Sequence, residues 1–408
     1  MTKIEDNARV CTQSIIHIAC GVEIPNRIAK SALSEGMAEP NGRPSEALFN
    51  LYEKWGKGGA GILFTGNVMV DQAHLVNANV MIAEEEIFLE DYKTLAQKAQ
   101  TNGTHLWMQI NHPGRQSPNY LDKAPVSASD VGMPSKLYVQ PRPLKEPEIL
   151  DLIERYGNAA LMAKKAGMKG AQIHGAHGYL VSQFLSPLTN IRTDKWGGSL
   201  ENRARFVLAI YKNMREKVGP DFPLGIKINS ADFQRGAFTE EESMTVIQLL
   251  DDAGMDLIEV SGGTYERAAM VGTMQKESTK QREAYFMDFI VKVRSKVKSP
   301  LMLTGGFRTA DTMINAISGG ELDFVGLGRP FCLYPNVAKE LISGDRLDCS
   351  VPPLLTGVDK IDMSGMLQTP WHMFQLVRMG KGLEPDPELD IWDVYEKVTG
   401  QERASAND

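Results

Sequence analysis

Short runs of apolar, largely β-branched residues alternate along the chain with amphipathic stretches, and this alternation constrains the fold more than any other feature. The runs predict eight strands, over 27–34, 61–66, 104–110, 170–174, 223–229, 256–261, 300–304 and 322–327. The stretches between and after them predict helices over 45–57, 88–101, 146–166, 201–218, 240–253, 284–297, 309–318 and 335–342. Strict alternation predicts a parallel sheet, and eight units close a (β/α)8, or TIM, barrel. An open doubly wound sheet is the competing architecture.

Three long connections indicate which end of the barrel carries function. Each follows the end of a predicted strand: 111–145, 175–200 and 262–283. In such barrels the loops after the strands build the active-site face, and long loops in compact domains are often functional. In the last loop, Tyr265, Glu266 and Arg267 are candidates for choosing a substrate, with a surface lid as the alternative.

The segments that flank the barrel are expected to pack against it. Residues 1–24 precede it, and the apolar runs on either side of Gly21 predict a hairpin that covers the barrel bottom. The barrel itself is expected over 25–345. A C-terminal extension follows over 346–408 and should mostly be packed, because it carries several large apolar residues, namely Trp371, Phe374, Leu376 and Trp392.

Composition excludes several classes of protein. A formal net charge of −7 argues against nucleic-acid binding. No run of about 18 apolar residues occurs, so no membrane span is expected. The first residues are polar and lack a signal-peptide core, and the four cysteines are scattered without a Cys-x-x-Cys pair. A cytoplasmic protein without a zinc knuckle or a cysteine-ligated iron–sulfur cluster is therefore expected.

Two of the seven histidines, His174 and His177, lie within four residues of each other, and Tyr179 follows two positions later. They come directly after a predicted strand, so a strand end carries two hydrogen-bond donors and a weak acid. That set can hold a substrate oxygen and supply one proton. Structural packing and a metal half-site are the alternatives. A metal ion needs a third ligand, and no Glu follows within the motif, so we expect no metal.

Glycines mark one misleading motif and two phosphate candidates. Residues 56–61 match Gly-x-Gly-x-x-Gly, but they follow a predicted helix and precede a strand, the reverse of a dinucleotide-binding turn. We interpret them as a helix stop and tight turn. Gly305 and Gly306 follow the seventh strand, and Gly328 and Arg329 follow the eighth. Barrels often bind phosphate at these two loops, whereas two ordinary turns and a surface Arg are the alternative.

Two other predicted strands offer polar side chains to the same end of the barrel. Gln109 can donate and accept together, which suits an amide-like ring edge. Lys227 lies in an apolar strand, where an inward-facing ammonium is unfavourable unless it meets a negative charge, although it could also face the surface. With the phosphate loops, these residues suit flavin mononucleotide (FMN). Gln109 would contact the pyrimidine edge, and Lys227 would offset the charge near N1 of the reduced ring.

The block from His174 to Arg203 contains His-Gly-Ala-His-Gly-Tyr, then Gln-Phe-Leu-Ser-Pro, then Arg-Thr-Asp-Lys-Trp-Gly-Gly-Ser-Leu-Glu-Asn-Arg. It resembles the old yellow enzyme family of flavin-dependent oxidoreductases, and the likeness extends over about 25–330. The resemblance implies an FMN-binding (β/α)8 barrel that takes a hydride from NADH or NADPH. Its members reduce activated C=C bonds of α,β-unsaturated carbonyl or nitro compounds, so the partner would be a small-molecule substrate.

The resemblance also implies roles for single residues. His174 and His177 match the pair that holds the substrate oxygen, and Tyr179 matches the proton donor. The remaining matches are flavin contacts: Ala32, Ser34, Gly66, Gln109, Lys227, Gly306, Gly328 and Arg329. Relatives often have Arg in place of Lys227, and Thr or Cys in place of Ser34. A homodimer is the family-level expectation, with Trp371 and Trp392 as candidates for the contact.

Alternative functions stay open on the same barrel. One is a flavin-dependent NADH oxidase, and another is an amine or alcohol dehydrogenase. A barrel retained as a binding or scaffold protein is a third. Relatives with an iron–sulfur cluster carry a cysteine cluster after the barrel, which this sequence does not have. The physiological substrate and the choice between NADH and NADPH cannot be predicted from the sequence.

Overall fold

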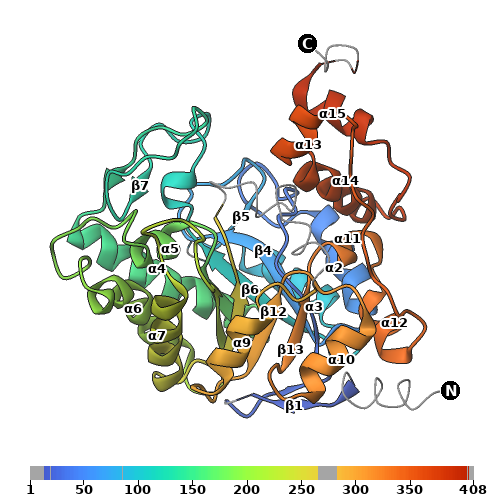
Figure 1. The fold of residues 1–408 in the computed structure, drawn as a ribbon, viewed down its shortest axis with the longest axis horizontal. Coiled ribbons are helices and arrows are strands. Elements are labelled where there is room, and N and C mark those ends of the chain that lie inside the picture. Colours follow the sequence, from blue (N-terminus) through green and yellow to red (C-terminus); the bar gives the residue numbers. More distant parts are fainter. Residues whose placement is uncertain (1–12, 19, 85, 265–282, 402, 404–408) are drawn as a thin grey trace.

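The computed structural model describes residues 13–18, 20–84, 86–264, 283–401 and 403. Its centre is a closed barrel of parallel strands surrounded by helices (Figure 1). The barrel strands are β3 (Ile28–Lys30), β4 (Ile62–Met69), β6 (His105–Asn111), β9 (Gly170–Gly175), β10 (Leu224–Asn229), β11 (Leu257–Ser261), β12 (Leu301–Thr304) and β13 (Phe324–Leu327). β3 pairs with both β4 and β13, which closes the ring. The (β/α)8 prediction is confirmed, and the open doubly wound sheet is excluded.

The helices that cover the barrel agree with the predicted ranges to within about three residues. They are α2 (Glu46–Lys57), α3 (Leu89–Ala99), α4 (Glu146–Lys165), α6 (Leu200–Val218), α7 (Glu240–Asp252), α9 (Met287–Arg294), α10 (Ala310–Ser318) and α12 (Val337–Ser343). Several short elements in the loops were not predicted: β5 (Met81–Ile82), η1 (Gly114–Gln116), β7 (Val126–Ser127), β8 (Arg142–Pro143), α5 (Leu180–Leu185) and α11 (Pro330–Leu333). β3 is also shorter than expected, so Ala32 and Ser34 lie in the loop that follows it.

Local sequence fixes several of these boundaries. Ser45 caps α2 by accepting from the backbone N–H of Leu48, and Thr239 and Glu242 form a reciprocal capping box at α7. α2 ends at Lys57, and Gly59 follows with φ +75°, a conformation that glycine adopts without strain. The Gly-x-Gly-x-x-Gly match therefore ends a helix, as its position predicted.

The end of the barrel where the strands begin is apolar and covered. Strands β1 (Ile16–His17) and β2 (Glu23–Ile24) pair antiparallel and form a hairpin below the barrel (Figure 1). Its side chains join the inward-facing residues at the strand starts in one buried cluster, which includes Ile16, Ile18, Ile24, Ala29, Ile62, Phe64, Trp107, Leu257, Met302 and Phe324. The opposite end, where the strands finish, is lined by polar side chains.

The C-terminal extension forms three helices that stand at one side of the barrel (Figure 1): α13 (Asp359–Ser364), α14 (Gln368–Gly380) and α15 (Ile391–Thr399). α14 packs on α2, where the Asn50 side chain donates to the Gly380 carbonyl at 3.2 Å. Trp371 and Trp392 are buried within the extension's own apolar cluster. Their burial leaves these two side chains almost no surface for a dimer contact, and the homodimer itself stays a prediction. Within the described ranges, no helix is long and apolar enough to span a membrane.

Candidate active site

His174, His177 and Tyr179 lie together at the carboxyl end of β9. The ring centroids of His174 and His177 are 5.2 Å apart, and those of His174 and Tyr179 are 4.8 Å apart, both in edge-to-face arrangements. His177 has φ +62°, an uncommon conformation for a residue with a side chain, and the backbone beside it pairs with Thr264. The sequence-predicted cluster is thus brought together on a strand end and the turn that follows.

Hydrogen bonds from the turn after β9 and from neighbouring strands fix the two histidines. The backbone N–H of Ala176 donates to Nδ1 of His174 at 3.3 Å, so the hydrogen of that ring sits on Nε2. The backbone N–H of His177 donates to Asn229 Oδ1 at 3.2 Å, and its Nε2 lies 2.9 Å from the hydroxyl of Ser261. Residues from β10 and β11 therefore position His177, whereas the turn after β9 sets the ring hydrogen of His174. Asn229 was not singled out in the sequence.

Both imidazoles are neutral at physiological pH. Burial holds the pKa of His174 well below the ordinary value, and the nearby His177 and Lys227 lower it further. Burial also lowers the pKa of His177 well below the ordinary value, and Lys227 lowers it further. A neutral imidazole offers one N–H donor, so these rings can hydrogen-bond an oxygen without adding a full charge to it.

A polar layer crosses the barrel interior directly below the strand ends. Gln109 donates through Nε2 to Gln172 Oε1 at 2.7 Å, and Gln172 donates through Nε2 to Glu259 Oε2 at 2.8 Å. Lys227 Nζ is 2.9 Å from Glu259 Oε1, and both side chains are buried. Lys227 thus faces inward and meets a negative charge, as its sequence context required. The partner, Glu259, was not predicted, although it too is a single charged residue in an apolar strand.

The first two strands contribute a second buried set. Gly66 donates its backbone N–H to Glu35 Oε1 at 2.7 Å and to the Tyr52 hydroxyl at 3.2 Å, and that hydroxyl in turn donates to Glu35. A Cβ at Gly66 would lie 1.9 Å from Glu35 Oε2. Ala32 and Ser34 are half-buried in the adjoining loop. Glu35 and Tyr52 were not predicted, because they differ from other Glu and Tyr residues of the chain only in these hydrogen bonds, which the sequence does not show.

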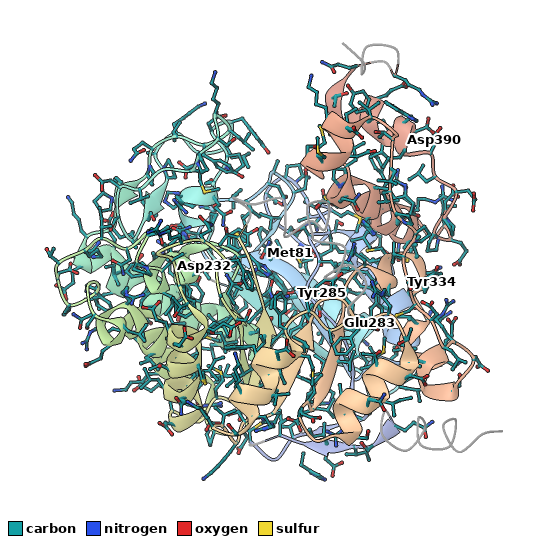
Figure 2. The ribbon with its side chains drawn as sticks, in the orientation of Figure 1. Met81, Asp232, Glu283, Tyr285, Tyr334 and Asp390 are labelled. Carbon is teal, nitrogen blue, oxygen red and sulfur yellow. The ribbon has the colours of Figure 1, made fainter. Side chains whose placement is uncertain are left out.

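The predicted phosphate loops lie side by side at the ends of β12 and β13. Gly305 and Gly306 have φ +135° and +87°, and Tyr285 donates its backbone N–H to the Gly305 carbonyl at 3.1 Å. Figure 2 shows Tyr285 near these strand ends. Gly328 and Arg329 follow β13, and the side chain of Arg329 is exposed. Across the described ranges, no hydrogen bond or ion pair to that guanidinium is found. The candidates Tyr265, Glu266 and Arg267 lie outside the described residues.

The metal alternative for the two histidines finds no support in the ligand geometry. Among residues 13–403 that are described, one group could share a metal ion, namely Asp71, His74 and His112, and His174 and His177 are not part of it. In that group, Nδ1 of His112 accepts from the Gly114 backbone N–H at 3.0 Å. The ring hydrogen therefore sits on Nε2, which disfavours coordination through that atom.

Comparison with known proteins identifies the family. The sequence profile of the NADH:flavin oxidoreductase / NADH oxidase family matches residues 16–347. This chain belongs to that family. It is 38% identical over 392 residues to the NADH-dependent flavin oxidoreductase nadA of Aspergillus parasiticus, covering 92% of this chain and 86% of that protein. The resemblance to old yellow enzyme relatives is therefore confirmed.

Solved structures share the barrel. A 2-naphthoyl-CoA reductase complex superposes with a TM-score of 0.80 at 25% identity, covering 91% of this chain and 58% of that enzyme. The old yellow enzyme homologue from Zymomonas mobilis superposes with a TM-score of 0.71 at 23% identity, covering 82% of this chain and 93% of that protein. As a family member, the chain is an oxidoreductase that uses FMN and NAD(P)H.

The residues at the strand ends suit FMN. The two glycine loops and the exposed Arg329 guanidinium provide donors for a phosphate. The ammonium of Lys227 carries three hydrogens and has Glu259 as its partner in the described structure, which leaves donors for a ring oxygen or nitrogen. Asn111 Oδ1, at the end of β6, is buried and has no hydrogen-bond partner within the described residues. These are the kinds of atoms that a bound flavin would satisfy.

Proposed function

We propose that this chain is an ene-reductase that reduces the C=C bond of α,β-unsaturated carbonyl or nitro compounds with electrons from NAD(P)H. The supporting observation is the cluster of His174, His177 and Tyr179, whose rings lie 4.8–5.2 Å apart at the barrel end that suits FMN. Two neutral donors and one phenol match the two needs of this reaction, which are to bind an oxygen that gains charge and to deliver one proton.

Bound FMN would supply the hydride chemistry of the reaction, between NAD(P)H and the β-carbon of the unsaturated compound. His174 donates its Nε2–H to the substrate oxygen, where negative charge develops. For His177 to donate as well, Ser261 must donate to its Nε2, because the ring hydrogen then sits on Nδ1. Loss of one such donor typically raises a barrier by about 2.7–4 kcal/mol.

Tyr179 is the proposed general acid. Its side chain is 6% exposed and packs edge-to-face against His174. Its hydroxyl would give its proton to the α-carbon as hydride reaches the β-carbon. A positioned acid of this kind contributes roughly 10²–10⁴-fold in rate. We expect the phenol hydrogen to be needed for the oxidative half-reaction, in which the substrate is reduced, and not for the reductive half-reaction with NAD(P)H.

Tyr179→Phe tests this assignment in stopped-flow experiments on the FMN-loaded enzyme. Reoxidation by 2-cyclohexenone should slow roughly 10²–10⁴-fold, whereas loss of flavin absorbance with NADH should change less than about threefold. Tyr120→Phe is the matched control, because Tyr120 is 63% exposed and should leave both rates unchanged. Equal losses in both half-reactions of Tyr179→Phe would refute the general-acid role.

An NADH oxidase is the second candidate, since the family description includes that activity. The two functions differ in what reoxidises the protein after NADH has reduced it. An ene-reductase should be reoxidised by 2-cyclohexenone or a nitroalkene faster than by dissolved oxygen at equal concentration. Oxygen outpacing every enone and nitroalkene tested would favour the oxidase and contradict our proposal.

A further inference from the structure

Glu259 is a fully buried carboxylate that the proposed chemistry does not use. It lies on β11 between Ile258 and Val260, which both face the surrounding helices, so its own side chain points into the barrel. Three donors converge on it: Lys227 Nζ at 2.9 Å, the Thr304 hydroxyl at 2.6 Å and Gln172 Nε2 at 2.8 Å. A buried ion pair is weak evidence for stability, because desolvation offsets much of its attraction. Its position below the candidate cofactor site therefore favours a role in function over one in stability.

The carboxylate dictates the direction of each hydrogen bond in the layer. Paired with an ammonium, Glu259 is ionised and can only accept, so Gln172 must turn its NH2 group toward it. The carbonyl oxygen of Gln172 then faces Gln109 and accepts from that residue's Nε2 at 2.7 Å. The amide nitrogen of Gln109 is thereby held inward, which leaves its carbonyl oxygen for a ligand at the barrel mouth.

We propose that Glu259 is a positioning residue for FMN, which turns the Gln109 carbonyl oxygen toward the flavin pyrimidine through Gln172 and moderates the charge of Lys227. This inference depends on the placement of FMN at the strand ends and not on which substrate is reduced. The pyrimidine N3–H is a donor, so a carbonyl oxygen pairs with it and an NH2 group would not. Reduced flavin gains negative charge near N1, and a Lys227 neutralised by Glu259 stabilises that charge less than a lone ammonium.

Glu259→Gln separates this role from simple packing, because the side chain keeps its size. Its one oxygen should face Lys227, since an NH2 group there would oppose the ammonium. Its NH2 group then faces Gln172, which must flip and make Gln109 present nitrogen to the cofactor. We expect the FMN dissociation constant of the apoprotein to rise about tenfold, the effect of one lost hydrogen bond. Fluorescence titration of FMN measures it.

The redox potential provides the second readout. Without the carboxylate, we expect binding of reduced FMN relative to oxidised FMN to improve about tenfold, a positive shift of about 30 mV for a two-electron couple. Equilibration with a reference dye measures the potential. Thr304→Val is the matched control, because it removes a donor to Glu259 and changes neither the charge nor the amide directions. It should leave the dissociation constant within about threefold and the potential within about 10 mV.

The exchange variant Gln172→Glu with Glu259→Gln tests the direction of the hydrogen bonds in the polar layer. The carboxylate at position 172 would accept from Gln109 Nε2, as the Gln172 carbonyl oxygen does in the parent, so the FMN dissociation constant should return to within about threefold of the parent value. This variant keeps one carboxylate in the layer and stays informative if Glu259→Gln does not fold. An unchanged dissociation constant and potential in Glu259→Gln, or no recovery in a folded exchange variant, would overturn the inference. Failure of the parent protein to bind FMN would instead contradict the cofactor placement on which the proposed function is built.

Discussion

Removing Lys227 while keeping Glu259 should destabilise the barrel strongly. The two side chains are 5% and 0% exposed, and the ammonium lies 2.9 Å from the carboxylate. Lys227→Met keeps most of the side-chain volume but leaves a buried charge without its partner, a change that typically costs about 3–5 kcal/mol. With an unfolding entropy of about 2.1 cal/mol/K per residue, a chain of this length has about 0.9 kcal/mol/K. The melting temperature should therefore fall by about 3–6 °C.

The assay is thermal unfolding of the apoprotein, because bound FMN would add a stabilisation of its own. The double variant Lys227→Met with Glu259→Gln should recover at least half of the loss, since no charge is then left unpaired. Lys57→Met is the control. Its side chain is 63% exposed and pairs with Glu53, so the melting temperature should change by less than about 1 °C. The reasoning would be refuted if the melting temperature of Lys227→Met fell by less than about 1 °C, or if the double variant were no more stable than the single one.

Three further predictions concern other positions. Gly66→Ala puts a Cβ 1.9 Å from Glu35 Oε2, so we expect a loss of about 1–3 kcal/mol and weaker FMN binding, and an unchanged melting temperature would contradict this. Burial lowers the pKa of His372 from about 6.5 to about 4, so the stability it contributes is complete above pH 6.5 and is lost as the pH falls toward 4. His372→Asn should flatten the urea-derived stability curve across that window by up to about 1.4 kcal/mol per pH unit, and parallel curves would disprove this. Arg329→Ala should raise the FMN dissociation constant about 10–100-fold and leave that of riboflavin, which lacks the phosphate, unchanged; equal weakening of both would show that the guanidinium does not bind phosphate.

The fold was predictable because its main elements leave a periodic signal. The buried barrel strands are continuous apolar runs, and the outer helices repeat their apolar residues every three or four positions. α5 and α11, with 6 and 4 residues, are too short to show a helical period. β3 ends at Lys30, one residue before Ser31, whose backbone N–H still donates to the Leu327 carbonyl at 2.8 Å.

The candidate site was predictable where residue type alone is informative. Two imidazoles and a phenol at a strand end stand out in any sequence, and the structure brings His174, His177 and Tyr179 together. Glu259 does not stand out, because its meaning depends on the register that places it opposite Lys227 across β10 and β11. The barrel prediction makes β10 and β11 neighbours, but the register between two strands joined by a helix cannot be derived from the sequence alone.

The covered lower end of the barrel has a kinetic consequence. The hairpin side chains Ile16 and Ile24 pack with Trp107 and Phe324 beneath the interior, so no path to the cofactor leads through that end. NAD(P)H and the oxidising compound must then approach from the same side and alternate. We expect ping-pong kinetics, with parallel double-reciprocal plots and with each reactant in excess inhibiting the other.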